Sequence, residues 1–324
     1  MLLTRGSRSE LAGPTAERRT PWTPTPLVDI SLPEIPPGVH VWAKIEAANP
    51  TGSVKDRTAR WMVDAAEDSG ALGPGGTIVE SSSGNTGIAL AAIGAARGYR
   101  VIIVCKTTVP PEKVSLLRLL GAEVRQVDSA EIGTDEHYLA LCTRIAADEG
   151  GVFVNQYENT ANPQAHYTST GPEIWEQSGH AVDVFVAGGG TGGTITGTAR
   201  FLREQHPDVT IVLADPVGSI YAHAHETGEL SDPVPYEVEA VGQAERMIPG
   251  SIDLSVVDRV VSVPDANSFA AVREVASRQG ILCGPSGGLA LAASMVVAAG
   301  SPEGTTIVTL LPDAADRYLS RGLR

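Results

Sequence analysis

The chain has 324 residues, of which 42% are hydrophobic and 19% are charged, a composition typical of globular proteins with room for two domains. Acidic residues outnumber basic ones by 38 to 24, and the formal net charge of −14 argues against a nucleic-acid partner. No run approaches 18 apolar residues, so no membrane-spanning segment is predicted.

The first twenty residues are polar, contain four arginines and lack a long apolar core. We interpret residues 1–20 as a flexible N-terminal arm rather than a secretory signal. The three cysteines, Cys105, Cys142 and Cys283, fit neither a metal site nor a disulfide framework. Free thiols are therefore expected, in a protein located in the reducing cytoplasm.

Short apolar runs alternate with helical patterns along the rest of the chain. Strands are predicted at 40–46, 77–80, 100–105, 123–127, 152–155, 182–187, 210–214, 259–263 and 305–311. Helices are predicted at 56–69, 85–97, 112–120, 191–205, 266–279 and 287–299. This alternation predicts an α/β fold with mostly parallel sheets flanked by helices. We place a domain boundary near residue 157, between an N-terminal domain at 21–157 and a C-terminal domain at 158–324.

The first stretch whose residues suggest a chemical role is 49–57. A turn there leads from a predicted strand into a helix, and Lys55 lies at the start of the helix. A cation there opposes the positive end of the helix dipole. The pKa of the amine is then lowered, which suits a lysine that must form a Schiff base. The alternative is an ordinary surface lysine beside Asp56.

The second stretch is the serine-rich turn at residues 81–87, between a predicted strand and a predicted helix. Hydroxyls, an amide and backbone N–H groups meet there at a helix N-terminus, which favours binding of an anion such as a carboxylate. The alternative is a serine-rich helix cap without a ligand.

The third stretch, residues 188–194, is rich in glycine and allows close approach of the backbone to an anion. Gly188, Gly190 and Gly193 also satisfy the dinucleotide-binding fingerprint, and Asp215 follows Gly193 at the spacing expected of its acidic residue. This stretch alone leaves NAD open as a cofactor. The hydroxyls of Thr191 and Thr194 favour a phosphate monoester instead.

The fourth stretch is the turn at residues 284–288, whose Ser286 could simply cap a helix. In this order, the four stretches resemble the cysteine synthase and cystathionine β-synthase family of fold-type II pyridoxal 5′-phosphate (PLP) enzymes. The resemblance extends from about residue 24 to 322 and includes the family-like block at 156–174. It implies the tryptophan synthase β-like fold, with two domains, PLP in the cleft between them, and a mobile part at about 100–145.

The resemblance assigns a role to each matching residue. Lys55 corresponds to the Schiff-base lysine, which is also the catalytic base. The remaining residues implied to bind the cofactor are Asn85 at the 3′-oxygen, Gly190, Thr191, Gly192, Gly193 and Thr194 at the phosphate, Ser286 at the ring nitrogen, and Asp313 as a second ring contact. The residues implied to bind the substrate carboxylate are Ser82, Ser83, Asn85, Thr86 and Gln156. No metal is assigned, since His137, His166, His223 and His225 show no metal-binding spacing.

The implied activity is β-replacement on serine, O-acetylserine or O-phosphoserine through an α-aminoacrylate. A sulfur nucleophile, either a thiol or sulfide, then gives cysteine or cystathionine. The chain departs from the family pattern at Ser81-Ser82, at Ala240 and at residues 243–247, near the expected entry of the nucleophile. A synthase of another β-substituted alanine or a serine/threonine dehydratase therefore stays open. An NAD-dependent oxidoreductase is a remote alternative.

The resemblance also implies a homodimer and adds serine acetyltransferase as a further partner. A catalytically idle binding protein is a third class of function. The presence of Lys55 within its motif argues against that class.

Overall fold

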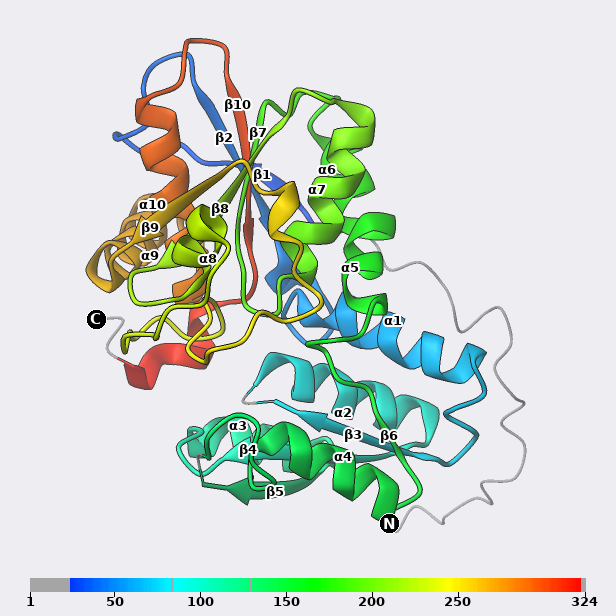
Figure 1. Cartoon of the computed structure of the whole chain (residues 1–324). Helices are drawn as coiled ribbons and strands as arrows, with labels where there is room; N and C mark the ends of the chain where they lie inside the picture. Colours follow the sequence, from blue (N-terminus) through cyan, green and yellow to red (C-terminus); the bar gives the residue numbers. More distant parts are fainter. Residues whose placement is uncertain (1–23, 83, 129, 322–324) are drawn as a thin grey trace, which may run out of the picture.

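The computed structural model describes residues 24–82, 84–128 and 130–321, and it contains two sheets with helices packed on them (Figure 1). The predicted arm at 1–20 and Ser83 lie outside these residues. Within the described ranges, none of the helices has the length and apolar character needed to cross a bilayer.

The larger sheet combines strands from both ends of the chain in the order β1-β2-β10-β7-β8-β9. Its strands are β1 (Leu27–Asp29), β2 (His40–Ile45), β7 (Val184–Gly188), β8 (Thr210–Pro216), β9 (Arg259–Val263) and β10 (Thr306–Leu311). All neighbours are parallel except β1, which pairs antiparallel with β2. Strand β10 therefore lies between a strand from the start of the chain and strands from its second half.

The smaller sheet is parallel throughout and has the order β5-β4-β3-β6. Its strands are β3 (Thr77–Ser81), β4 (Arg100–Lys106), β5 (Glu123–Val127) and β6 (Val152–Phe153). Side chains of β4 alternate between two cores, because Ile103 packs toward α1 and α2 whereas Ile102 and Val104 pack toward α4. The unbroken apolar run in β4 follows from burial of both faces.

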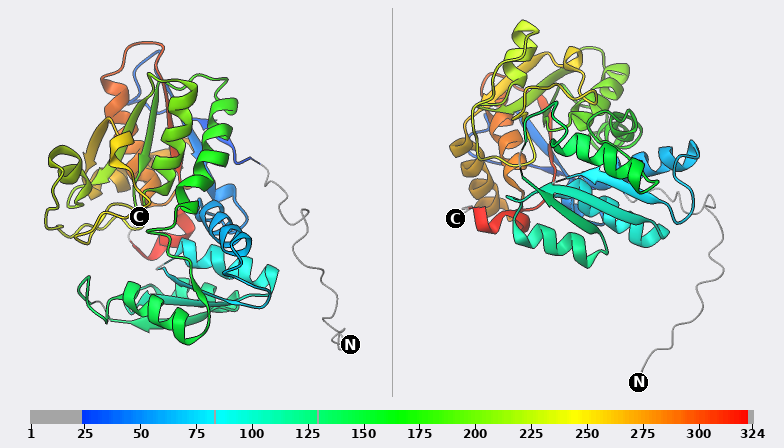
Figure 2. Two further views of the ribbon diagram at one scale, coloured as in Figure 1. Left: turned by 45° about the vertical axis from the view of Figure 1, so that its right-hand side comes forward. Right: turned by 60° about the horizontal axis from the view of Figure 1, so that its bottom comes forward.

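Helices cover both faces of each sheet. Around the smaller sheet lie α1 (Lys55–Asp68), α2 (Asn85–Arg97), α3 (Pro111–Leu119) and α4 (Tyr138–Asp148). The larger sheet carries α9 (Asp265–Gln279) and α10 (Pro285–Ala299) on one face, and α6 (Gly171–Gln177), α7 (Gly193–Gln205) and α8 (Tyr221–Thr227) on the other. Short segments complete the fold: η2 (Glu46–Ala48), α5 (Ala161–Ala165), η3 (His166–Thr170), η4 (Leu254–Val256) and η5 (Ala315–Arg321). The left view of Figure 2 shows the smaller sheet and its helices below the larger sheet.

The predicted α/β class and the mostly parallel sheets are confirmed. All nine predicted strands occur, and the bounds of β5 and β9 agree with the prediction. Strand β1 was missed because it has only three residues, and helix α4 was not predicted. The boundary near residue 157 stays a prediction. The topology adds that β1 and β2, before that boundary, belong to the larger sheet through the pairing of β2 with β10.

Candidate active site

A cavity of about 310 Å³ lies between the two sheets, where parallel strands end and helices begin. Such carboxyl ends are where α/β folds usually bind ligands. All four stretches singled out in the sequence contribute to its wall. The predicted site residues in the wall are Lys55, Ser82, Asn85, Thr86, Gln156, Gly190, Thr191, Gly192, Thr194 and Ser286.

Lys55 is the first residue of α1 and is half-buried at the cavity wall. Among the described residues, its Nζ atom makes no hydrogen bond or ion pair. Burial lowers the pKa of the Lys55 amine to about 8, and the nearby Glu80 carboxylate opposes that shift. The amine is thus partly neutral near physiological pH, as a nucleophilic lysine requires.

Asp56 shapes the turn that presents Lys55. Its carboxylate accepts hydrogen bonds from the backbone N–H groups of Thr51, at 2.9 Å, and Ser53, at 3.5 Å. Gly52 adopts a φ of 83°, a left-handed conformation that favours glycine. The Asp56 carboxylate binds backbone N–H groups of this turn, and Lys55 lies at the cavity wall. Lys55 is therefore not an ordinary surface lysine paired with Asp56.

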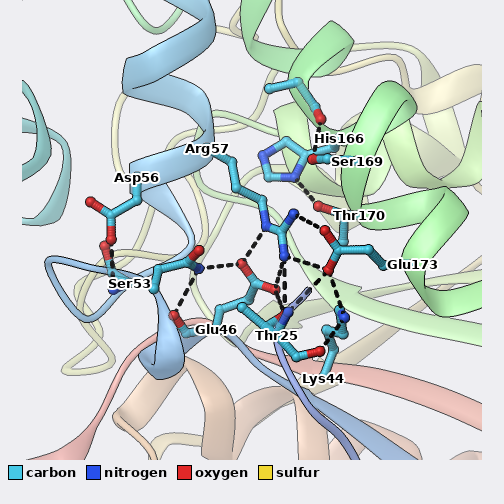
Figure 3. A network of polar contacts seen from close by, with 12 residues as sticks. Thr25, Lys44, Glu46, Ser53, Asp56, Arg57, His166, Ser169, Thr170 and Glu173 are labelled. Atoms are coloured by element: carbon cyan, nitrogen blue, oxygen red, sulfur yellow. Dashed lines mark hydrogen bonds and ion pairs between the residues drawn. The ribbon is translucent and has the colours of Figure 1, made fainter. Parts of the chain in front are cut away.

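A buried ion network anchors α1 directly after Lys55, as Figure 3 shows. The Arg57 guanidinium donates to Glu46 at 2.8 Å and to Glu173 at 2.6 Å. Lys44 pairs with the same Glu173 at 2.7 Å, and Thr25 donates to Glu46 at 2.7 Å. The network joins α1 to β2 and α6, so the helix that carries Lys55 is held to the larger sheet.

The turn at 81–87 is locked to Gln156. Thr86 donates from Oγ1 to Gln156 Oε1 at 2.6 Å, and Gln156 Nε2 donates to the Ser81 carbonyl at 3.0 Å. Ser82 Oγ accepts from the N–H groups of Gly84, at 3.2 Å, and Gly87, at 2.9 Å. Ser82 therefore orders the helix start as a cap does, while its own O–H remains able to donate to a ligand.

Glu80 holds this turn and Gln156 together through their backbone N–H groups. The sequence analysis did not identify Glu80 as a residue of the site. Its carboxylate accepts from the N–H of Ser81 at 2.8 Å and from the N–H of Gln156 at 3.1 Å. The side chain is fully buried, and burial raises the pKa of Glu80 to about 8. A charged residue inside the apolar strand β3 was the only signal that the sequence offered.

The glycine-rich loop connects β7 to α7 and forms another part of the wall. Gly192 has a φ of 84°, and a Cβ there would lie 2.1 Å from the Cβ of Ile252. Thr191 Oγ1 accepts from Asn162 Nδ2 at 2.9 Å, which leaves its O–H to donate. Gly193 does not line the cavity, because it begins α7 against Asn162.

Ser286 lies in the first turn of α10 and is almost fully buried at the cavity wall. Its Oγ atom has no hydrogen-bond partner among the described residues. The interpretation of Ser286 as a helix cap is therefore not supported, because no side chain caps α10. A buried hydroxyl without a partner at a cavity wall is the kind of group that a ligand satisfies.

Asn85 and Asp313 contact each other, although only Asn85 lines the cavity. Asn85 Nδ2 donates to Asp313 Oδ2 at 2.6 Å, and Asn85 Oδ1 accepts from Arg317. Asp313 is fully buried behind Asn85. Its predicted direct contact with a cofactor ring stays a prediction.

Four charged side chains, Lys106, Lys113, Glu239 and Glu245, line one part of the cavity wall, which we call the cavity mouth. Lys113 Nζ lies 2.6 Å from Glu239 Oε2. Glu245 Oε2 accepts from the Tyr138 hydroxyl at 2.8 Å and lies 3.2 Å from His137 Nε2, and Glu245 Oε1 lies 3.2 Å from Lys106 Nζ. The sequence placed Ala240 and residues 243–247, which include Glu245, near the entry of a nucleophile, but it did not predict the partners of Glu245.

The residues present fit PLP. The free Lys55 amine suits its aldehyde, and the unpartnered Ser286 hydroxyl suits a ring heteroatom. Gly190, Thr191, Gly192 and Thr194 line the cavity where α7 begins, and a helix N-terminus suits a phosphate. Asp215, the acid of the dinucleotide fingerprint, does not fit that role. It is fully buried, accepts from the Ala222 N–H at 3.1 Å and does not line the cavity.

Comparisons with known proteins agree with this fit. The family model described as pyridoxal-phosphate dependent enzyme matches residues 19–313. Cysteine synthase B of Escherichia coli is 39% identical over 92% of this chain and 93% of the relative. The O-acetylserine dependent cystathionine beta-synthase of Bacillus subtilis is 38% identical over 92% and 94%.

Longer relatives match over only part of their length. Cystathionine beta-synthase of Rattus norvegicus is 42% identical over 92% of this chain, which spans 54% of that relative. Among solved structures, O-ureido-L-serine synthase superposes with a TM-score of 0.84 at 36% identity and covers 92% of each chain.

Proposed function

Because the chain belongs to the pyridoxal-phosphate dependent enzymes, we propose that it replaces the β-substituent of a serine-type amino acid with a sulfur nucleophile. The amino-acid donor is serine, O-acetylserine or O-phosphoserine, and the product is cysteine or cystathionine. One observation carries the proposal: the free amine of Lys55, the turn at 81–87 and the unpartnered hydroxyl of Ser286 meet in a single cavity.

Lys55 moves the proton in this proposal. When bound, PLP withdraws electron density from the α-carbon of an attached amino acid. Lys55 Nζ accepts the α-proton in its neutral form and returns it once the new β-substituent is in place. Burial supports this role, because it lowers the pKa of the amine to about 8 and so maintains a neutral fraction near physiological pH.

The turn at 81–87 orients the substrate. The Ser82 hydroxyl and the backbone N–H groups of Asn85 and Thr86, at the N-terminus of α2, provide donors for a carboxylate. Gln156 holds both ends of this turn, because it accepts a hydrogen bond from the Thr86 hydroxyl and donates one to the Ser81 carbonyl. A carboxylate bound there places the rest of the amino acid in the cavity, where Lys55 lies.

Ser286 sets the electronic character of the site. A serine hydroxyl opposite a pyridine nitrogen does not force protonation of that nitrogen, whereas a carboxylate would. The weaker electron withdrawal that results favours loss of a β-substituent over transamination or racemisation. Asn85 and the loop at 190–194 hold the remaining edges of the cofactor in this proposal.

A second candidate is the synthesis of another β-substituted alanine. It is favoured by the mouth of the cavity, where Lys106, Lys113, Glu239 and Glu245 present charged groups to an entering nucleophile. The similarity to O-ureido-L-serine synthase supports the same candidate, since the name of that relative describes a serine derivative without a sulfur substituent.

We further propose a homodimer in the cytoplasm, with serine acetyltransferase as a partner. Resemblance to the family is the support for these points. The part at about 100–145 closes over the substrate in this proposal, and Lys106, Lys113, His137 and Tyr138 are the side chains by which it would contact the opposite loop.

The deciding experiment records the visible absorption of the purified protein before and after adding O-acetylserine without a thiol, and measures released acetate. A yellow protein whose band changes as acetate appears supports the proposal, and sulfide and homocysteine then compete as nucleophiles. Formation of pyruvate from serine without a thiol would identify a dehydratase instead. A colourless protein that PLP cannot reconstitute would overturn the proposal and return attention to a dinucleotide.

A further inference from the structure

The side-chain amide of Asn85 is held at both ends by the C-terminal turn of the chain. Nδ2 donates to Asp313 Oδ2 at 2.6 Å, and Oδ1 accepts from the Arg317 guanidinium. Both partners lie more than 220 residues later in the sequence, Asp313 just before η5 and Arg317 within it. Asn85 itself forms part of the cavity wall, whereas Asp313 and Arg317 do not.

These two contacts fix which way the amide points. A carboxylate only accepts hydrogen bonds, and a guanidinium only donates them. Rotating the amide by half a turn would place oxygen against oxygen at Asp313 and N–H against N–H at Arg317. The orientation of Asn85 is therefore set by the protein before any ligand arrives. One N–H of Nδ2 is used by Asp313, and the second N–H remains for a ligand.

Asp313 is itself held in place. The Tyr318 hydroxyl donates to Asp313 Oδ2 at 2.5 Å, and both side chains are almost completely buried. Lys113 Nζ lies 4.6 Å from the centre of the Tyr318 ring. The other carboxylate oxygen, Oδ1, has no partner among the described residues. That oxygen packs against Gly284, where an added Cβ would come within 2.1 Å of it.

The same turn reaches the other parts of the cofactor site. The Gly284 N–H donates to the Asp313 carbonyl at 3.0 Å, next to the turn that carries Ser286. Arg317 donates to the Thr51 carbonyl, in the turn that leads to Lys55. The segment from Asp313 to Tyr318 thus contacts the supports of Lys55, Asn85 and Ser286 together.

We propose that Asp313 and Arg317 are positioning residues that orient the Asn85 amide, so that its second N–H is presented to the phenolic oxygen of PLP. This inference rests on the proposed function, because it assumes that PLP occupies the cavity. It gives Asp313 a role through Asn85 instead of the direct ring contact that the resemblance implies. A hydrogen bond to the phenolic oxygen stabilises the ionised chromophore, so the proposal is visible in the spectrum of the bound cofactor.

The test uses the variants Asp313→Ala and Arg317→Met, each of which removes one partner of the amide. Asp316→Ala is the matched control, because Asp316 lies on the same turn and is exposed. The apoprotein of each variant is titrated with PLP, and the position of the visible band and the dissociation constant are recorded. Circular dichroism and thermal melting establish that each variant is folded.

In both test variants, we expect a displaced band and a dissociation constant raised by roughly tenfold, as for loss of one hydrogen bond to a charged group. We expect Asp316→Ala to match the unmodified protein. In an Asn85→Ala background, Asp313→Ala should add less than about a twofold effect, since residues that act through one group are not additive.

Three outcomes would overturn the inference. Folded test variants with the original band and affinity would show that the amide needs no orientation. Full effects that persist in the Asn85→Ala background would show that Asp313 acts independently of Asn85. An unmodified protein that binds no PLP would remove the proposed function, and the inference with it. If Asp313→Ala does not fold, Arg317→Met is compared in the unmodified and the Asn85→Ala backgrounds, because Arg317 also donates to the Thr51 carbonyl, and a full effect that persists without Asn85 would overturn the inference.

Discussion

Lys113 Nζ and Glu239 Oε2 lie 2.6 Å apart and join helix α3, beside the smaller sheet, to the loop that precedes β9. The Lys113 side chain is only 9% exposed, whereas that of Glu239 is 27% exposed. This ion pair therefore links the two sides of the cavity mouth with one charge that is almost buried. Any nucleophile that enters from this side must pass it.

Glu239→Gln is expected to weaken the contact across the cavity mouth, because it leaves Lys113 nearly buried without its counter-charge. The KM for the nucleophile should rise by about tenfold, equivalent to roughly 1.4 kcal/mol, with a smaller change in kcat. Steady-state kinetics at a saturating concentration of the amino-acid donor measure this. The neighbouring, exposed Glu237→Gln serves as the control. An unchanged KM in Glu239→Gln would separate the ion pair from nucleophile entry.

Lys55→Ala should abolish turnover and the visible band that depends on a covalent link between cofactor and lysine. The physical reason is that the variant removes the free amine at the cavity wall, whereas the other two lysines that line the cavity, Lys106 and Lys113, are held in ion pairs with Glu245 and Glu239. Absorption spectra and product assays check the two effects separately. Lys106→Ala is expected to keep the band, because Lys106 lies at the mouth in an ion pair with Glu245. Normal turnover in Lys55→Ala would overturn the catalytic assignment.

The stability of the apoprotein should fall as the pH rises from about 6 to about 8. Burial raises the pKa of Glu80 from 4.5 to about 8, so between these values the folded state holds a proton that the unfolded chain releases. Stability therefore falls as pH rises through this window. Burial lowers the pKa of Lys55 from 10.5 to about 8, so this amine has the opposite effect above pH 8, where burial also raises the pKa values of the three cysteines and opposes it; the prediction therefore concerns the range below pH 8.

Urea unfolding of the apoprotein at about pH 6 and about pH 8 measures this dependence as a change in the transition midpoint. In Glu80→Gln, the decline between about pH 6 and about pH 8 should largely disappear, because the titrating acid is absent. A decline of unchanged slope in that variant would assign the titration to another group. Because the slope is compared, a uniform loss of stability in Glu80→Gln does not affect the result.

Arg57→Ala should destabilise the fold by about 3–5 kcal/mol, the usual cost of leaving buried charges without a partner. The variant removes the shared partner of Glu46 and Glu173, and the Glu46 side chain is fully buried (Figure 3). Arg278→Ala, which breaks an exposed pair with Glu274, should cost less than about 0.5 kcal/mol. Urea unfolding of both variants gives the comparison. Equal values would mean that the network around Arg57 contributes no more than a surface pair.

The parts of the site that the sequence predicted are those that depend on local chain geometry. Lys55, Ser286 and the loop at 190–194 each lie where a turn enters a helix, and a run of neighbouring residues is enough to identify such a turn. The alternation of apolar runs and helical patterns likewise depends on nearby residues. This is why the nine predicted strands occur and why β5 and β9 agree at both ends.

The parts that could not be predicted depend on contacts between distant residues. Glu80 meets the N–H of Gln156, 76 residues later, and Asn85 meets Asp313, 228 residues later. No local pattern reports which groups a folded chain brings together over such separations. For the same reason the spacing of Asp215 could not exclude a dinucleotide site. Only its burial away from the cavity removes that role.

The position of β10 between β2 and β7 also has a consequence for the synthesis of the chain. The smaller sheet is formed by residues 77–153 alone, so its strands can pair while the ribosome is still translating the second half. The larger sheet has to wait for residues 306–311, because β10 lies between the pair β1 and β2, from the first fifty residues, and the strands β7, β8 and β9. The pairing that joins the part of the sheet before Lys55 to the part before Ser286 therefore has to wait until residues 306–311 have been synthesised. Before that moment, the strands of the smaller sheet have all been synthesised, whereas the cofactor site still lacks one of the strands that hold it together.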